Sequence, residues 1–224
     1  MEGVTAVVAV REGSRRLKDK NIRPFGESNL LIHKLRQLKS VNGIDNIVVS
    51  SDSERMLEMA KKEGVKIHKR QAEYCDERTK TMGEVIQYVC QNIEGVHIAW
   101  TPCTAPLISV ETYEAAIKKY FWALENKYDS LVSVAVLKEF ILDDNGPVNY
   151  ELGVNQVCSQ DLKPLYADRG GIMMAPRIKM IEWKYNYGSK PYLFKLDKKE
   201  CLDINDELDL ECAKAWLNLV DEAD

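Results

Sequence analysis

The strongest constraint on the fold is an alternation of short apolar runs with segments of helical period. Residues 4–10 (VTAVVAV) are apolar at all but one position, as in a central strand that is covered on both faces. Residues 30–39 follow with helical spacing, and the two patterns then take turns as far as residue 137. A chain of this kind forms a parallel or mostly parallel sheet with helices on its faces. We therefore expect a Rossmann-like α/β fold.

The individual elements can be placed from spacing and capping residues. The expected strands are residues 4–10, 47–49, 65–68, 96–100, 131–137, 171–175 and 192–196. The expected helices are residues 30–39, a helix capped by Ser53, a stripe over 82–93, a helix capped by Ser109 and a last helix from about Asp206. In that last helix we expect the buried stripe to be Leu208, Cys212, Ala215, Trp216 and Leu219.

A chain of 224 residues is expected to form one domain, here residues 1–224. From about residue 138 to 168 the regular pattern loosens into turn-rich sequence such as DDNGP. We expect a small insertion or flap there rather than another strand–helix unit.

The composition excludes several classes of protein. The formal net charge is −4, so the chain lacks the broad positive surface that nucleic-acid binding needs. No apolar run approaches the roughly 18 residues that span a bilayer, and the N-terminal sequence has no signal-peptide pattern. The six cysteines form no CxxC pair and are expected to be reduced packing residues. We expect a cytoplasmic protein without a nucleic-acid or membrane partner.

The loop after the first strand is unusually basic for an acidic protein. Around Gly13 and Ser14 it carries six cations: Arg11, Arg15, Arg16, Lys18, Lys20 and Arg23. In open α/β sheets such a loop borders the ligand crevice, and a glycine lets backbone N–H groups approach an anion. A solvated basic loop is the alternative, but the position after the first strand favours a phosphate site.

Common motifs of phosphate and hydrolytic enzymes are absent. The sequence has no GxxxxGK[ST], GxGxxG, GxSxG or HExxH motif. The three histidines lie far apart in the sequence and are expected to be structural. Chemistry carried out by positioning, cations and a metal ion is therefore favoured.

Two further segments stand out. Residues 103–107 (CTAPL) follow the strand that ends at Trp100, and Pro102 and Pro106 stiffen this loop, although a plain turn is an open alternative. Asp203 and Asn205 are spaced i, i+2, which suits a Mg²⁺ that keeps several waters. An acidic helix N-terminus is the alternative, but it leaves Asp203 unexplained.

Taken together, these segments resemble the CMP-sialic acid synthetases (acylneuraminate cytidylyltransferases). VAVREGSRRLKDKNI matches the family motif I-P-A-R-x-G-S-K-x-L-x-x-K-N-I without a gap. NIVVSSDS, CTAPL and DINDELDLECA resemble three further motifs of that family, in the same order. The resemblance extends from about residue 4 to residue 213.

The resemblance implies a glycosyltransferase-A-type nucleotidyltransferase fold with a mixed, mostly parallel sheet. It implies transfer of CMP from CTP to an acidic keto-sugar, sialic acid or a related nonulosonate, with release of pyrophosphate. The residues that it places against the nucleotide are Arg11, Gly13, Ser14, Arg15, Lys20, Asn21, Arg70, Thr81 and Thr104. Thr104 would also face the sugar, together with Arg169 and Gly170.

The same resemblance implies Mg²⁺ as cofactor, with Asp203 and Asn205 as its ligands. Arg11, Lys20 and Asp203 would be the catalytic residues, and the insertion would reach into a second subunit of a homodimer. Asn205 stands where the family has a second aspartate. Two alternatives stay open: a nucleotidyltransferase of the same fold that acts on another sugar or sugar phosphate, and a non-catalytic nucleotide-binding protein.

Overall fold

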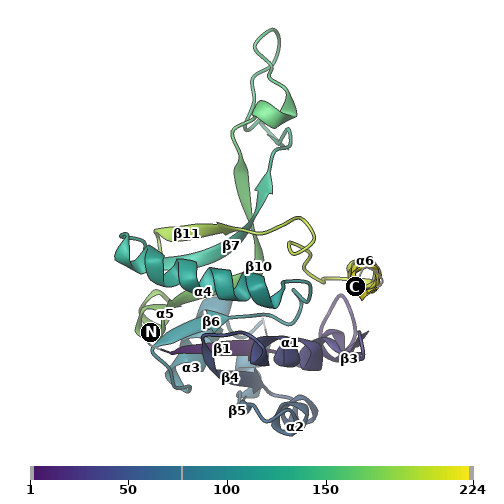
Figure 1. Ribbon diagram of the computed structural model, residues 1–224, viewed down its shortest axis with the longest axis vertical. Coiled ribbons are helices and arrows are strands. Elements are labelled where there is room, and N and C mark those ends of the chain that lie inside the picture. Colours follow the sequence, from purple (N-terminus) through teal and green to yellow (C-terminus); the bar gives the residue numbers. More distant parts are fainter. Residues whose placement is uncertain (1–2, 77, 222–224) are drawn as a thin grey trace.

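The computed structural model of the protein describes residues 3–76 and 78–221 (Figure 1). Within these residues one large sheet contains β1 (Val4–Ala9), β4 (Ile44–Ser51), β5 (Lys66–Lys69), β6 (His97–Trp100), β7 (Ser130–Leu137), β10 (Leu165–Pro176) and β11 (Pro191–Lys195). Their order across the sheet is β11-β7-β10-β6-β1-β4-β5. Only β10 among them runs antiparallel to its neighbours. The predicted α/β fold with a mixed, mostly parallel sheet is confirmed.

Helices cover both faces of the sheet. They are α1 (Leu30–Lys39), α2 (Glu54–Lys62), α3 (Met82–Gln91), α4 (Val110–Glu125) and α5 (Arg177–Trp183). A further helix, α6 (Glu207–Asp221), lies away from the large sheet. Leu35 of α1 and Tyr113 of α4 pack with Val8 of β1 on one face. Met180 of α5 packs with Val7 on the other face. Because neighbouring β1 residues point to opposite helical layers, an unbroken apolar run is what this strand requires.

Helix starts follow the capping residues. The side chains of Asn29, Ser53, Thr81 and Ser109 each accept a hydrogen bond from a backbone N–H three residues further on, at the starts of α1, α2, α3 and α4. These bonds satisfy N–H groups that have no partner inside the helix. The predicted caps at Ser53 and Ser109 are confirmed.

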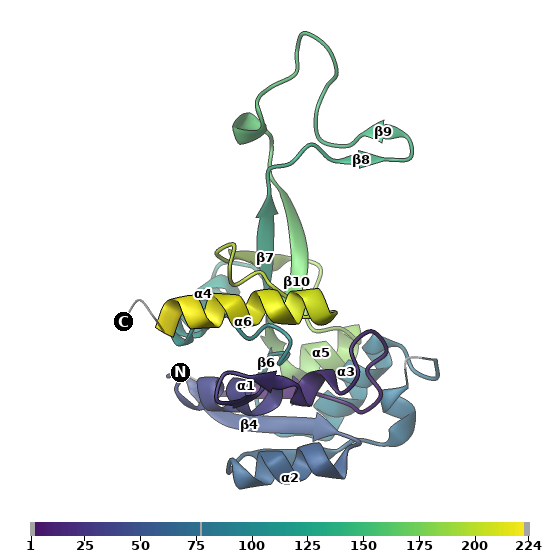
Figure 2. The same ribbon diagram turned by 90° about the vertical axis from the view of Figure 1, so that its right-hand side faces the viewer.

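The turn-rich segment forms a projecting arm (residues 138–164), which leaves the body where β7 and β10 continue outward as a paired ribbon (Figure 2). The arm contains the short hairpin strands β8 (Leu142–Asp143) and β9 (Gly146–Pro147) and a 3₁₀ turn at Ser159–Asp161. β10 begins at Leu165 rather than at the expected residue 171, because its first residues pair with the end of β7. Two smaller strands, β2 (Pro24–Phe25) and β3 (Ser28–Asn29), form a separate hairpin.

The predicted buried stripe of α6 is wrong. Leu208 is 73% exposed and Trp216 is 46% exposed, and Cys212 and Ala215 are exposed as well. The side chain of Leu219 lies outside the described residues. The helix instead buries Leu210 and Ala213 against a small cluster formed by Leu17, Phe25 and Leu30. α6 therefore packs on the segment that follows the basic loop and not on the sheet.

No helix in the described part of the chain is long and apolar enough to cross a membrane. All six cysteines are free, and Cys75, Cys90 and Cys103 are buried. Burial raises the pKa of the Cys103 thiol to about 12, which keeps it protonated. Cys75, Cys90 and Cys103 pack in the interior as expected, whereas Cys158 and Cys212 are exposed and are not packing residues. A cytoplasmic location stays a prediction.

Candidate functional site

A cavity of about 750 Å³ opens at the carboxyl ends of β1 and β6. These two strands are parallel neighbours, and the chain winds outward from β1 to β4 and β5 before it returns to β6 on the other side of β1. The loops after two such strands diverge, which leaves a crevice between them. The predicted nucleotide residues that line it are Arg11, Ser14, Arg15, Lys20, Asn21, Arg70, Thr81 and Thr104.

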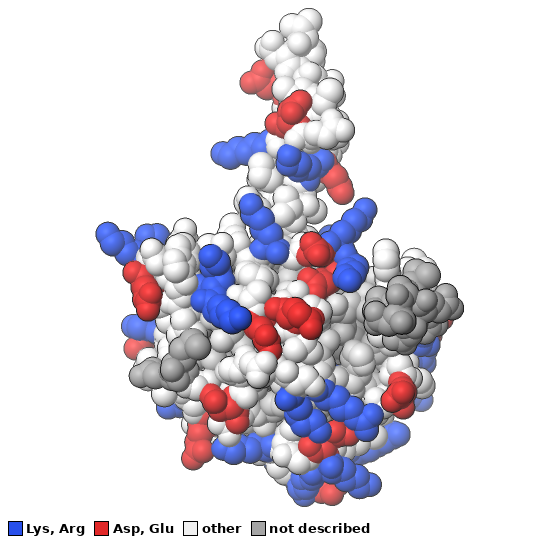
Figure 3. Space-filling model, in the orientation of Figure 1, with Lys and Arg blue, Asp and Glu red and all other residues white. Residues whose placement is uncertain are grey.

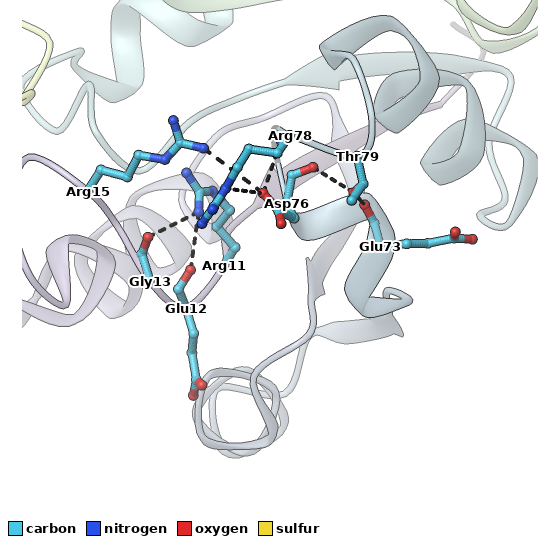
Figure 4. A network of polar contacts seen from close by, with 8 residues as sticks. All are labelled: Arg11, Glu12, Gly13, Arg15, Glu73, Asp76, Arg78 and Thr79. Atoms are coloured by element: carbon cyan, nitrogen blue, oxygen red, sulfur yellow. Dashed lines mark hydrogen bonds and ion pairs between the residues drawn. The ribbon is translucent and has the colours of Figure 1, made fainter.

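The basic loop is held in a fixed shape by contacts of its own (Figure 4). Arg11 Nη1 donates to the backbone oxygen of Gly13 at 3.1 Å, and Asn21 Nδ2 donates to the backbone oxygen of Arg11 at 3.1 Å. Gly13 has φ +69°, a left-handed backbone conformation that residues other than glycine rarely adopt. Arg15 reaches across the cavity mouth to within 4.0 Å of the Asp76 carboxylate. The loop thus presents its cations to the cavity from a shaped backbone.

Arg70 fixes the start of the basic loop. Its side chain is buried, Nη2 donates to the backbone oxygen of Val10 at 2.6 Å, and Nε donates to Cys75 Sγ at 2.9 Å. Thr81 caps α3 with its hydroxyl, which accepts from the Glu84 N–H at 3.3 Å. Both residues lie in the cavity wall, where the sequence predicts them, and both also stabilise the wall itself.

The three segments found in the sequence meet at Ile204. Lys20 Nζ donates to the Ile204 backbone oxygen at 2.9 Å, and the Ile204 N–H donates to the backbone oxygen of Thr104 at 2.8 Å. Cys103 Sγ also lies 3.3 Å from Asn21 Oδ1, as a donor to it. Hydrogen bonds therefore join the basic loop, the CTAPL loop and residues 203–205 (the DIN segment) into one unit.

Asp203 and Asn205 lie next to each other beside the cavity. Asn205 Nδ2 donates to Asp203 Oδ2 at 2.9 Å, while Asn205 Oδ1 accepts from Arg16 Nη2 at 2.6 Å. Burial raises the pKa of the Asp203 carboxyl, and hydrogen bonds from Thr104 and Asn205 together with the charge of Lys20 act in the opposite direction.

This donor set can be compared with what Mg²⁺ requires. Among the described residues no group of three or more histidine, cysteine, aspartate or glutamate side chains converges on one point. Mg²⁺ is commonly held by one or two carboxylates plus substrate phosphates and waters. Asp203 fits such a site as its carboxylate ligand. The amide oxygen of Asn205 fits only after it leaves Arg16.

The predicted sugar residues are not part of this cavity wall. Arg169 and Gly170 lie in an irregular stretch of β10 between Asp168 and Met173, where the pairing with β7 shifts register. Gly170 has φ +64°, and its N–H donates to Asp168 Oδ1 at 2.8 Å. The positive charge of Arg169 acts on Cys201, two residues before Asp203. The structure thus brings this pair near the DIN segment but not into the cavity.

Several cavity residues were not expected from the sequence. Tyr74 lines the wall and stacks on Tyr88 with ring centres 3.9 Å apart, and Lys80 Nζ lies 5.1 Å from the centre of the Tyr74 ring. Met82 and Trp100 add apolar surface to the same wall. No motif marks Tyr74, which lies in a short 3₁₀ helix (Ala72–Cys75) between β5 and α3.

The chain is similar to proteins of known kind. It is 26% identical to the pseudaminic acid cytidylyltransferase of Campylobacter jejuni over 93% of each chain. It is 24% identical to N-acylneuraminate cytidylyltransferase A of Danio rerio, over an alignment that covers 94% of this chain and 50% of that protein. Its fold matches the structure of CMP:2-keto-3-deoxy-manno-octonic acid synthetase complexed with CTP, with a TM-score of 0.70 and 11% identity over 97% of this chain and 99% of the other.

A match to the family model adds to these likenesses. The model described as "Cytidylyltransferase" matches residues 5–198, which include the basic loop and the CTAPL loop. The fold, the strand-end cavity and the motifs that line it agree with that match. The resemblance seen in the sequence is confirmed, and the chain belongs to the cytidylyltransferase family.

Proposed function

We propose that this enzyme transfers CMP from CTP to an acidic keto-sugar of the nonulosonate type and releases pyrophosphate. The observation that carries the proposal is the convergence of Arg11, Ser14, Lys20 and Thr104 on one strand-end cavity in a chain of the cytidylyltransferase family. The named relatives act on pseudaminic acid and N-acylneuraminate, and both are sugars of this kind.

In the proposed reaction the sugar hydroxyl attacks the α-phosphorus of CTP and pyrophosphate leaves. Negative charge grows on the phosphate oxygens, and Arg11 and Lys20 stabilise it from the basic loop. Gly13 and Ser14 let the loop backbone approach the phosphates. Thr104 borders the nucleotide and the sugar, and Arg169 and Gly170 take the sugar side.

Asp203 would hold Mg²⁺ in this proposal, with Asn205 as a second, neutral ligand. The ion would supply charge neutralisation at the phosphates and would make a bound hydroxyl easier to deprotonate. The protein's own part is to keep Asp203 in place, which the Asn205 amide and the Thr104 side chain do by hydrogen bonding.

We also propose a homodimer formed through the insertion at residues 138–168. The arm exposes Leu142, Val148, Leu152, Val154 and Val157, and Val154 is fully open to solvent. Figure 3 shows that the far end of the arm is mostly uncharged. Several large apolar side chains exposed on one projecting segment favour an interaction site there.

The test is to measure pyrophosphate release with CTP, Mg²⁺ and a panel of keto-sugars, beside the thermal stabilisation given by each nucleotide. CTP should stabilise the fold by roughly 2.7 kcal/mol at a hundredfold excess over Kd, and ATP, GTP and UTP should stabilise it less at the same concentration. Equal stabilisation by all four would remove the cytidine assignment. Pyrophosphate release only with sugars other than nonulosonates would assign the enzyme a different substrate. Stabilisation by CTP without pyrophosphate release would indicate a non-catalytic nucleotide-binding protein.

A further inference from the structure

A lysine is completely buried behind the cavity. Lys34 of α1 has no exposed surface, and its Nζ donates to Ala105 O at 2.8 Å, to the Tyr113 hydroxyl at 2.7 Å and to Gln37 Oε1 at 2.5 Å. Three acceptors match the three N–H bonds of an ammonium group. Burial is nevertheless unfavourable for a charged group, because it removes the water that would solvate the ammonium, and it lowers the pKa of Lys34 to about 7.

The free-energy cost of burying this ammonium makes a purely structural role a poor explanation for Lys34. The neighbouring core positions of α1 hold Leu31 and Leu35, which pack against the sheet without any desolvation penalty. Replacing a buried charge by an apolar side chain of similar volume is often neutral or stabilising. The presence of a lysine at position 34 is therefore best explained by the groups to which its ammonium donates hydrogen bonds.

The ammonium group of Lys34 binds the CTAPL loop, and this loop in turn binds Ile204 of the proposed site. Ala105 follows Thr104, whose backbone oxygen accepts from the Ile204 N–H at 2.8 Å. The Ile204 backbone oxygen in turn accepts from Lys20 Nζ at 2.9 Å. A short path of backbone and side-chain hydrogen bonds thus leads from Lys34 to Ile204, the residue between Asp203 and Asn205.

Other α1 side chains bind the same loop. Gln37 Nε2 donates to the backbone oxygen of Ile108 at 2.5 Å, and His33 Nε2 lies 3.2 Å from that of Pro106. Glu200 accepts from the Ser109 N–H at 2.9 Å at the far end of the loop. One helix therefore anchors a loop that has no regular secondary structure of its own.

We propose that Lys34 is a positioning residue, which fixes residues 104–108 and through them sets Asp203 and Lys20 in register for phosphoryl transfer. The inference rests on the proposed function of the cavity. Lys34 does not line the cavity and touches no substrate in this assignment. It acts through the backbone oxygen of Ala105, and its bonds to Tyr113 and Gln37 keep the ammonium group in the position that this contact requires.

The experiment compares Lys34→Met with Lys39→Met. Lys39 lies on the same helix but is exposed and pairs with Glu63, so it controls for the loss of a cation from α1. Amide hydrogen exchange at Ile204 should become roughly tenfold faster in Lys34→Met and stay unchanged in the control. Unchanged exchange at Ile204 in a folded Lys34→Met would overturn the inference.

Kinetics give the second measurement. Because misplacement of reacting groups costs turnover, kcat of Lys34→Met should fall on the order of tenfold or more, with KM for CTP nearly unchanged. A fall in stability with normal kcat would mean that Lys34 is structural only. If the wild-type protein releases no pyrophosphate while exchange at Ile204 still depends on Lys34, the proposed function fails and the coupling of the loop to Ile204 stands.

Tyr113→Phe keeps the test possible if Lys34→Met does not fold. It removes one acceptor of the ammonium group and leaves the aromatic ring in the core. A smaller change of the same sign in exchange at Ile204 and in kcat is expected. No change in either quantity would contradict the proposed path.

Discussion

The cavity and the arm differ in how their side chains are used. The cavity brings together polar side chains from distant segments, and buried groups such as Lys34 and Arg70 hold its loops by hydrogen bonds to backbone oxygens. The arm is a single continuous segment, and apolar side chains such as Leu152 and Val154 stay exposed on it. The residues proposed to bind the nucleotide line one cavity of a single chain, whereas the arm leaves apolar side chains exposed, which motivates the proposed dimer. The predictions below separate these two regions.

The largest effect is expected from Asp203→Asn. Removing the carboxylate leaves no charged ligand among the two proposed metal ligands, so Mg²⁺-dependent pyrophosphate release should be lost. Nucleotide should still stabilise the fold through the basic loop, and the oligomeric state should not change. Asp206→Asn is the matched control, because an asparagine there can still accept from the Asp209 N–H. Retained turnover in Asp203→Asn would place the metal elsewhere.

The basic loop is tested by Lys20→Ala against Lys18→Ala. Lys20 lines the cavity and holds the Ile204 oxygen, whereas Lys18 is exposed and is not part of the cavity wall. Turnover should fall about 10²-fold for Lys20→Ala, measured as pyrophosphate release, and much less for Lys18→Ala. Equal sensitivity of the two lysines would show that the loop is read in the wrong register.

The arm is tested by Leu152→Asp combined with Val154→Asp. Charges at these exposed apolar positions should convert the dimer into a monomer, because each costs more to bury than the side chain it replaces. Sedimentation velocity measures the change, and Asp144→Asn in the same arm serves as the control. CTP stabilisation should survive. A monomeric wild-type protein would contradict the role given to the arm.

The smallest effect is expected from Asn205→Asp. A carboxylate adds negative charge beside Asp203, so the Mg²⁺ concentration for half-maximal activity should fall a few-fold. The new charge would also hold Arg16 more tightly, which limits the gain. Measuring activity against Mg²⁺ concentration checks this, with Arg16→Ala as a companion variant. An unchanged Mg²⁺ dependence would remove Asn205 from the metal site.

The fold could be predicted because its strands and helices carry local information. β1 is apolar except at Thr5, since both of its faces are covered, and Ser53 and Ser109 mark helix starts by their own hydrogen bonds. α6 was misread because two stripes are possible on it, and the packing partner decides between them. α5 was not expected, since it has seven residues and buries only Met180.

Most of the residues predicted to bind the nucleotide line one cavity, but Arg169 and Gly170 do not, and the contacts between the site residues could not be predicted. The motifs placed Arg11 and Thr104 at strand ends, and strand order then brings them together. The contact of Arg16 with Asn205 joins side chains that are 189 residues apart, and no local pattern encodes it. Lys34 resembles any surface lysine of a helix until the neighbouring loop is seen.

The bond between Lys20 and Ile204 has a consequence for how the protein is made. It joins residues 184 positions apart, so it closes nearly the whole chain into a loop. Contacts of such long range form late, because the entropy of closing the loop must be overcome first. During synthesis the basic loop emerges early and waits for the DIN segment, so a nascent chain has no complete site until residue 205 has left the ribosome. The two parts of the proposed site can therefore come together only after the chain between them has been synthesised.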